Sequence, residues 1–111
     1  LQQFLGVKHA VCVTNATIAL MMVVEAMGLS GKVILPAFTF IASAQSLTWT
    51  NIQPVFCDVD PDTHQISVDQ VAALIEPGVS AIMGVNLWGG ACDAKALAEL
   101  AAANGSKLYF D

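Results

Sequence analysis

The sequence contains no arginine, and its four lysines are outnumbered by nine acidic residues, which gives a formal net charge of −5. A nucleic-acid-binding protein normally presents a basic face to the phosphate backbone, and this chain lacks the cations to form one. Only 12% of the residues are charged while 56% are hydrophobic, so the composition excludes an intrinsically disordered chain. A length of 111 residues allows one domain with a real core.

Long apolar runs and targeting signals are also missing. The most apolar stretch, residues 18–24, ends at Glu25 and falls far short of the roughly 18 residues that a membrane-spanning helix needs. The first residues carry no basic cluster of the kind that opens a secretory signal. We therefore expect a cytoplasmic protein that does not enter a membrane. Because the sequence does not open with methionine, we also expect it to come from inside a longer protein.

Metal and nucleotide motifs are equally scarce. The cysteines, Cys12, Cys57 and Cys92, form no C-x-x-C pair, which argues against a disulfide scaffold or a zinc site and favours buried thiols in a reducing compartment. The acidic turn at residues 58–62 resembles the start of a calcium loop, but Thr63 stands where that loop needs glycine. Neither a G-x-G-x-x-G nor a P-loop motif is present. We expect no metal site.

Short apolar runs alternate with helix-like runs along the whole chain. Strands are expected at residues 11–13, 32–35, 53–57, 81–85 and 107–110, and helices at residues 16–27, 42–49, 67–75 and 94–103. This alternation predicts an α/β fold with a mostly parallel sheet. Because the expected strands are continuously apolar, we expect helices on both faces of the sheet.

The helix expected at residues 16–27 lacks a polar stripe, since residues 18–24 are all apolar. A helix on the surface of an α/β layer should present a polar face to water. Two interpretations follow. The helix is deeply buried in a larger domain, or it lies at a subunit interface.

In open α/β sheets, ligands bind outside the carboxyl ends of the strands. The backbone amides that open the helix at residues 16–27 could receive a phosphate, although ordinary capping by Asn15 explains the same residues. An aromatic residue from the segment 36–40 could stack on a flat ligand or pack in the core. Asn86 and Asp111 follow the last two expected strands and place polar groups at the same edge.

Five segments resemble, in order, motifs of the DegT/StrS group of fold-type-I, pyridoxal-phosphate-dependent aminotransferases. They are residues 14–20 (TNATIAL), 36–43 (PAFTFIAS), 54–63 (PVFCDVDPDT), 86–89 (NLWG) and 108–111 (LYFD). The resemblance covers the whole chain. It implies that residues 1–111 are part of an aspartate-aminotransferase-like large domain. It also implies that the family's Schiff-base lysine and small domain lie beyond Asp111, so that no catalytic residue is expected in this chain.

The resemblance further implies which residues hold pyridoxal 5'-phosphate. The amides of Ala16 and Thr17 would bind its phosphate, and Phe40 would lie against its pyridine ring. Asp111 would bond to the ring nitrogen, and Asn86 is a further implied contact. A carboxylate beside that nitrogen stabilises the protonated ring, which the cofactor needs as an electron sink.

The sequence departs from the family pattern at three positions: Asn15 replaces a serine, Asn86 replaces a histidine, and Phe110 replaces a glutamate. The function implied is transfer of an amino group from an amino acid to a keto-sugar nucleotide, by a homodimer. Without arginine, this segment is not expected to bind the nucleotide diphosphate alone. Two alternatives stay open, a non-catalytic α/β module that self-associates and a phosphate-binding domain of flavodoxin-like type.

Overall fold

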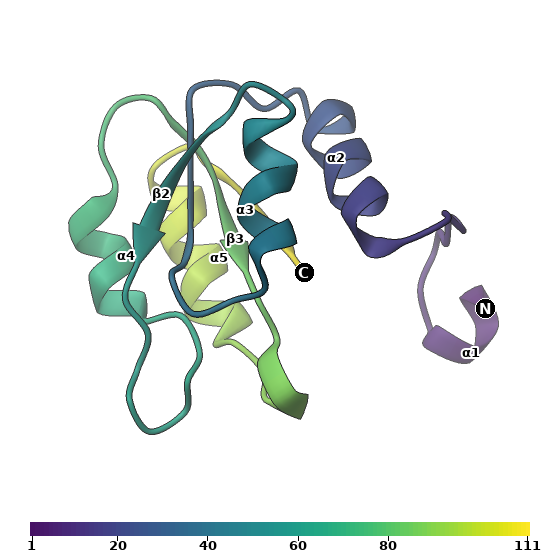
Figure 1. Cartoon of the computed structure of the whole chain (residues 1–111). Helices are drawn as coiled ribbons and strands as arrows, with labels where there is room; N and C mark the ends of the chain where they lie inside the picture. Colours follow the sequence, from purple (N-terminus) through teal and green to yellow (C-terminus); the bar gives the residue numbers. More distant parts are fainter.

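A parallel sheet with helices on both faces organises the computed structural model, which describes residues 1–111 (Figure 1). The strands lie in the order β2-β1-β3-β4 and are β1 (Lys32–Pro36), β2 (Gln53–Cys57), β3 (Val79–Gly84) and β4 (Lys107–Phe110). The helices are α1 (Gln2–Leu5), α2 (Ala16–Ala26), α3 (Ile41–Thr48), α4 (Val68–Leu74), α5 (Ala94–Ala103) and the short 3-10 helix η1 (Leu87–Gly89). All three strand pairings are parallel, so the predicted fold class is confirmed.

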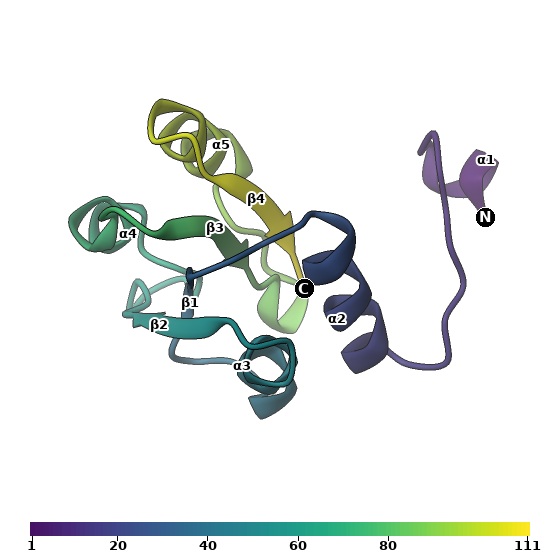
Figure 2. The same ribbon diagram turned by 90° about the horizontal axis from the view of Figure 1, so that it is seen from above.

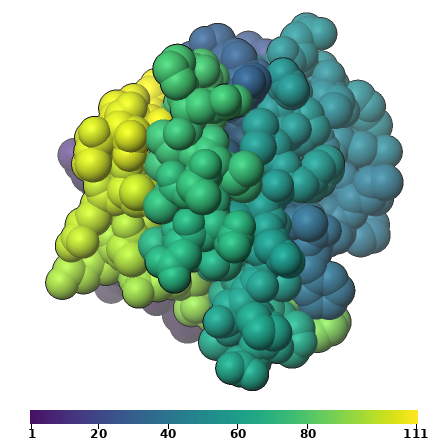
Figure 3. Space-filling view, turned by 90° about the vertical axis from the view of Figure 1, so that its left-hand side faces the viewer, coloured from purple at the N-terminus to yellow at the C-terminus, as the bar shows by residue number.

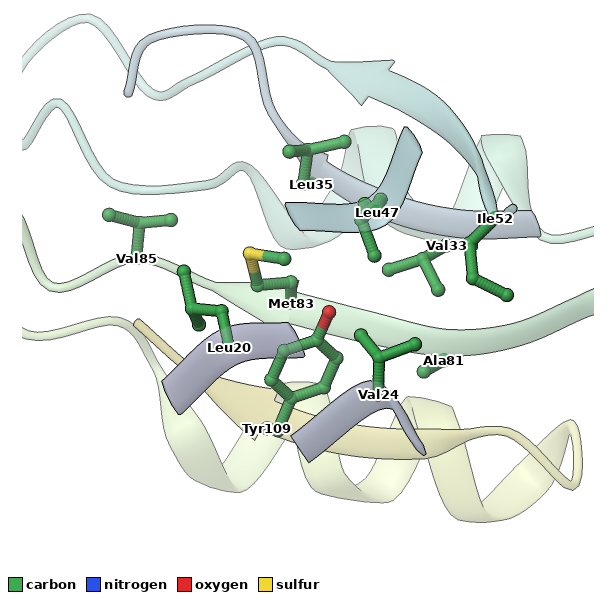
Figure 4. Close-up of a cluster of buried hydrophobic side chains, with 10 residues drawn as sticks. All are labelled: Leu20, Val24, Val33, Leu35, Leu47, Ile52, Ala81, Met83, Val85 and Tyr109. Carbon is green, nitrogen blue, oxygen red and sulfur yellow. The ribbon is translucent and has the colours of Figure 1, made fainter. Parts of the chain in front are cut away.

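Strands β1, β3 and β4 contribute side chains to two separate cores because successive residues point to opposite faces, whereas β2 contributes to only one of them. In β1, Val33 and Leu35 face α2 and α3, whereas Ile34 faces α4 and α5. Figure 2 shows the two helix pairs on opposite sides of the strands, and Figure 4 shows the first core, made of Leu20, Val24, Val33, Leu35, Leu47, Ile52, Ala81, Met83, Val85 and Tyr109. Each fully buried aliphatic side chain contributes about 1.5–3 kcal/mol.

Side-chain caps and one glycine fix where the main elements begin. The carboxamide of Asn15, the hydroxyl of Ser67 and the carboxylate of Asp93 each accept an amide hydrogen bond at the start of α2, α4 and α5. Gly31 precedes β1 with a φ of 71°, and a Cβ there would lie 2.6 Å from the carbonyl oxygen of Gly78. No larger residue fits that turn without a backbone shift.

The strand predicted at residues 11–13 is wrong. Val11 is 78% exposed, and residues 7–15 run apart from the sheet (Figure 2). A strand needs a neighbour to pair its backbone groups, and no other segment pairs with residues 11–13. Lys8, which precedes this segment, therefore does not lie at the amino end of a sheet strand.

Helix α2 forms as predicted but keeps much of its apolar surface. Leu20 and Val24 are buried, whereas Ile18 and Met22 remain 39% and 49% exposed. A hollow of about 670 Å³ lies between this outer face and Trp49, the residue that directly follows α3. The chain itself thus does not bury the helix deeply.

The opposite side of the molecule is covered by α4 and α5 (Figure 3). The acidic turn after β2, residues 58–64, projects beyond the sheet on this side (Figure 3). No helix has the length and apolar character that crossing a membrane requires.

Tyr109 supplies a stability prediction. Its side chain is only 7% exposed, its hydroxyl has no hydrogen-bond partner, and burial, followed by the charge of Asp111, raises the pKa of the phenol. We expect Tyr109→Phe to increase the free energy of unfolding of the natural protein by about 1 kcal/mol, because the ring remains while the desolvated hydroxyl is removed. Urea denaturation measures this, with Leu47→Ala as a control that lowers stability by about 2–5 kcal/mol. A less stable phenylalanine variant would contradict the assignment of an unpartnered hydroxyl.

Candidate functional site

The carboxyl ends of the strands meet at one edge, where several chain segments gather. Figures 1 and 2 show the carboxyl terminus close to the first turn of α2, the start of α3 and the loop that follows β3. These segments contain every residue that the sequence analysis singled out, namely Ala16, Thr17, Phe40, Asn86 and Asp111. For Phe40, Asn86 and Asp111 the common edge follows from the parallel pairing of the strands, whereas Ala16 and Thr17 begin a helix that no strand precedes.

The first turn of α2 presents unpaired amides. Asn15 adopts an extended conformation, and its Oδ1 atom accepts a hydrogen bond of 2.9 Å from the Ile18 amide. The amides of Ala16 and Thr17 donate to no acceptor in the chain. Capping by Asn15 is therefore observed, and it leaves two amides at the positive end of the helix dipole available to an anion.

Asp111 is held at the end of the sheet through its backbone. Its amide donates to the carbonyl oxygen of Gly84 (2.9 Å), and its own carbonyl oxygen accepts from the Asn86 amide (3.1 Å). The Oδ2 atom of its carboxylate accepts a hydrogen bond of 2.6 Å from the Ser43 hydroxyl. The Oδ1 atom has no protein partner, so one carboxylate oxygen remains free at the exposed edge.

The two aromatic side chains of the segment after β1 take different positions. Phe38 packs against Trp88 and His64, with ring centroids 5.4 Å and 6.0 Å away. Phe40, directly before α3, is 75% exposed. Packing in the core, the alternative kept open for these aromatics, does not apply to Phe40.

Asn86 closes a loop. Its Oδ1 atom accepts a hydrogen bond of 3.0 Å from the Cys92 amide, which ties together the segment between β3 and α5. The side-chain carbonyl already accepts this hydrogen bond, whereas the side-chain amide nitrogen makes none within the chain. A cofactor contact by Asn86 stays a prediction.

Sequence reasoning missed two buried polar residues near this edge, Ser43 and Gln65. Gln65 is 7% exposed and donates from Nε2 to the carbonyl oxygen of Leu87 at 3.3 Å, which joins the loops after β2 and β3. A Cβ on Gly90 would lie 2.5 Å from that Nε2 atom. For Ser43, a polar residue on the buried face of a predicted helix is the only sequence signal, and Gln65 lies in a loop, where no such signal exists.

The acidic turn after β2 closes on itself. The Oδ1 atom of Asp60 accepts from the amide and the hydroxyl of Thr63, at 2.8 Å and 2.9 Å, and these bonds lower the pKa of Asp60. Nowhere in the chain do three or more His, Cys, Asp or Glu side chains gather as metal ligands would.

Comparison with known proteins gives one family. The model of the DegT/DnrJ/EryC1/StrS aminotransferase family matches residues 1–111. A GDP-perosamine synthase of Vibrio cholerae is 36% identical over 98% of this chain. A dTDP-4-amino-4,6-dideoxy-D-glucose transaminase of Shigella dysenteriae is 39% identical over 98% of it. The chain spans 30% of the length of each of these curated relatives.

Solved structures agree in fold. The structure of DesI in the presence of its TDP-sugar product superimposes with a TM-score of 0.95 at 46% identity, over 99% of this chain and 28% of that one. The structure of NtdA from Bacillus subtilis, with bound cofactor PMP, gives a TM-score of 0.95 at 25% identity, over 98% of this chain and 26% of that one.

Two buried cysteines beside this edge generate a pH prediction. Burial, followed by the charge of Asp58, raises the pKa of the Cys57 thiol from 9.0 to about 11, and burial also raises the pKa of Cys92. At pH 8 we expect both thiols of the folded protein to react with a thiol reagent far more slowly than after unfolding in urea. Below the pKa of Cys57, the rate at which its thiol reacts should rise about tenfold per pH unit, because the thiolate is the reactive form.

The same shift predicts how stability changes with pH. The folded state holds the Cys57 proton more tightly than the unfolded chain does, so this contribution to stability is lost as pH rises from 9.0 towards about 11. If the thiol reagent labels Cys57 equally fast in the native and the unfolded protein at pH 8, both expectations are contradicted.

Proposed function

Since the chain belongs to the DegT/DnrJ/EryC1/StrS aminotransferase family, we propose that it forms part of an enzyme that binds pyridoxal 5'-phosphate at the carboxyl edge of its sheet. That enzyme would transfer an amino group from an amino acid to a keto-sugar nucleotide. The observation that carries the proposal is the Asp111 carboxylate, anchored at this edge with one free oxygen. Nucleotide sugars appear in the names of relatives such as the dTDP-4-amino-4,6-dideoxy-D-glucose transaminase.

The residues at the edge fit the parts of this cofactor. The unpaired amides of Ala16 and Thr17 suit a phosphate, since they combine donors with the positive end of a helix dipole. The exposed ring of Phe40 suits a flat aromatic face. The free oxygen of Asp111 suits a protonated pyridine nitrogen.

Each group at this edge would have a distinct role in binding the cofactor. Pyridoxal 5'-phosphate, when bound, supplies an electron sink for bonds at the carbon that carries the amino group. Asp111 would hold the proton on the ring nitrogen, and a charged partner stabilises that protonation state. Phe40 would orient the ring and exclude water from one of its faces. The amides of Ala16 and Thr17 would anchor the opposite end.

We propose that none of the four lysines of this chain attaches covalently to the cofactor. Lys32 begins β1 and pairs with Glu76 at 2.6 Å, and Lys107 begins β4 and donates to the carbonyl oxygen of Met27. Both lie at the amino edge, roughly 13 Å from the carboxyl edge across four strand residues. Lys95 is exposed in the first turn of α5, and Lys8 is exposed before α2. We infer that the attached lysine follows Asp111 in the natural protein.

The substrate's phosphates need cations that this chain does not provide, because it has no arginine. We infer that the rest of the protein or a second subunit of a homodimer supplies them. The free state of all three cysteines is compatible with the cytoplasmic location that we propose.

Borohydride reduction of the natural protein loaded with pyridoxal 5'-phosphate tests this function. We expect peptide mapping to find the modified lysine outside residues 1–111, and we expect Asp111→Asn to lower aminotransferase activity about hundredfold through loss of a charged hydrogen bond.

Three results would contradict the proposal in different ways. If one of the lysines of this chain is modified and the enzyme turns over substrate, the attached lysine lies within residues 1–111 and its inferred position is wrong. These lysines are Lys8, Lys32, Lys95 and Lys107. Cofactor binding without turnover would support the non-catalytic module. No affinity for the cofactor would support a flavodoxin-like phosphate-binding domain.

The exposed apolar face of α2 generates a prediction about assembly. We propose that a second copy of the protein covers this face, since large apolar patches are rarely left in water. Sedimentation of the natural protein at micromolar concentration should show a dimer that Met22→Glu weakens, whereas Ala98→Glu on the exposed face of α5 leaves it intact. A monomeric parent protein, or a dimer unaffected by Met22→Glu, would refute the interface.

A further inference from the structure

A fully buried hydroxyl reaches the carboxylate at the sheet edge. Ser43 lies in the first turn of α3, is 0% exposed, and donates from Oγ to Oδ2 of Asp111 at 2.6 Å. The two residues are separated by 68 positions in the sequence. This is the only hydrogen bond that the Asp111 side chain makes with the rest of the chain.

The direction of hydrogen bonding around Ser43 follows from its single proton. The hydroxyls of Thr39 and Ser43 are 2.8 Å apart, and either could donate. A carboxylate only accepts, so the Ser43 proton is committed to Asp111 and Thr39 must donate to Ser43. The result is a directed chain from Thr39 through Ser43 to Asp111. Cooperative polarisation along such a chain strengthens its last bond.

Backbone bonds alone do not fix the carboxylate. The pairing with Gly84 and Asn86 holds the main chain of Asp111, but the side chain of an exposed aspartate can still rotate about its own bonds. With Oδ2 tied to a rigid, buried helix residue, Oδ1 is left pointing away from Ser43 and free of protein partners.

We propose that Ser43 is a positioning residue that orients the Asp111 carboxylate, so that its free oxygen faces the ring nitrogen of the cofactor. The inference rests on the role proposed for Asp111 above. Ser43 acts through Asp111 and touches neither cofactor nor substrate. Thr39 supports it by donating a hydrogen bond to the Ser43 hydroxyl oxygen.

The test uses the natural protein and three variants. Ser43→Ala removes the hydroxyl, and Ser43→Thr retains it. Ser46→Ala is the matched control, because Ser46 is also 0% exposed in α3 but bonds to the carbonyl oxygen of Ser43 and not to Asp111. The readouts are the affinity for pyridoxal 5'-phosphate, the ¹⁵N chemical shift of its labelled ring nitrogen, and the urea midpoint.

We expect Ser43→Ala to weaken cofactor affinity roughly tenfold and to move the ring-nitrogen shift towards that of unprotonated pyridine. Ser43→Thr should restore both values, and Ser46→Ala should change only the urea midpoint. If Ser43→Ala leaves the nitrogen shift unchanged, or if Ser46→Ala moves it equally, the hydroxyl is merely structural and the proposal is overturned.

Asp111→Asn separates the failure of this inference from failure of the proposed function. If Asp111→Asn changes the nitrogen shift and Ser43→Ala does not, only the role of Ser43 is refuted. If Asp111→Asn also leaves the shift unchanged, Asp111 is not the partner of the ring nitrogen, and both proposals are refuted. In the double variant, Ser43→Ala should add nothing to the effect of Asp111→Asn, since one acts through the other.

Discussion

The pairing of β3 with β4 is the constraint on which the rest of the site depends. Its register sets Gly84 opposite Phe110, and one further hydrogen bond, from the Asp111 amide to Gly84, carries the ladder to the edge. A Cβ on Gly84 would lie 2.6 Å from the Phe110 ring, so a larger residue there would require that ring to move. A shift of one residue in this register would turn the side chain of Asp111 to the other face of the sheet. The bond from Ser43 would then be lost, and α3 would have no link to the carboxylate.

The two apolar cores stabilise this register against a shift. Strands β1, β3 and β4 place alternate residues under α2 and α3 or under α4 and α5, so a slip of β4 against β3 would expose apolar side chains on both faces. The proposed site is therefore anchored on packed strands, while the groups that we propose to face the cofactor, such as Phe40 and the first amides of α2, lie at the exposed rim. This division suits a site that must hold a flat cofactor in one orientation.

Most of the fold was predictable from the sequence because its elements are set by local patterns. The strands at residues 53–57 and 107–110 and the helix at residues 94–103 match the structure in both bounds. The strand predicted at residues 11–13 does not form. A strand forms only beside a partner, and local sequence carries no information about where that partner lies. The exposed outer face of α2 was not predictable for a similar reason: the apolar sequence does not say whether the same chain or the second copy proposed above covers it.

The candidate site was predictable only in part. The motifs locate Ala16, Thr17, Phe40 and Asp111 at one edge. For Phe40 and Asp111 this follows because the carboxyl ends of parallel strands coincide, whereas Ala16 and Thr17 follow no strand and depend on the position of α2. Ser43 was missed because its role arises from a contact across 68 residues, which no spacing rule reveals. The loop-closing bond of Asn86 likewise depends on the path of the chain to Cys92.

The most direct test of the account is a crystal structure of the natural protein with pyridoxal 5'-phosphate bound. The account predicts that Oδ1 of Asp111 lies about 2.7–2.9 Å from the ring nitrogen, as in a charge-assisted hydrogen bond. The phosphate should lie on the amides of Ala16 and Thr17. A cofactor bound elsewhere, or a ring nitrogen that faces another group while Asp111 points away, would contradict it.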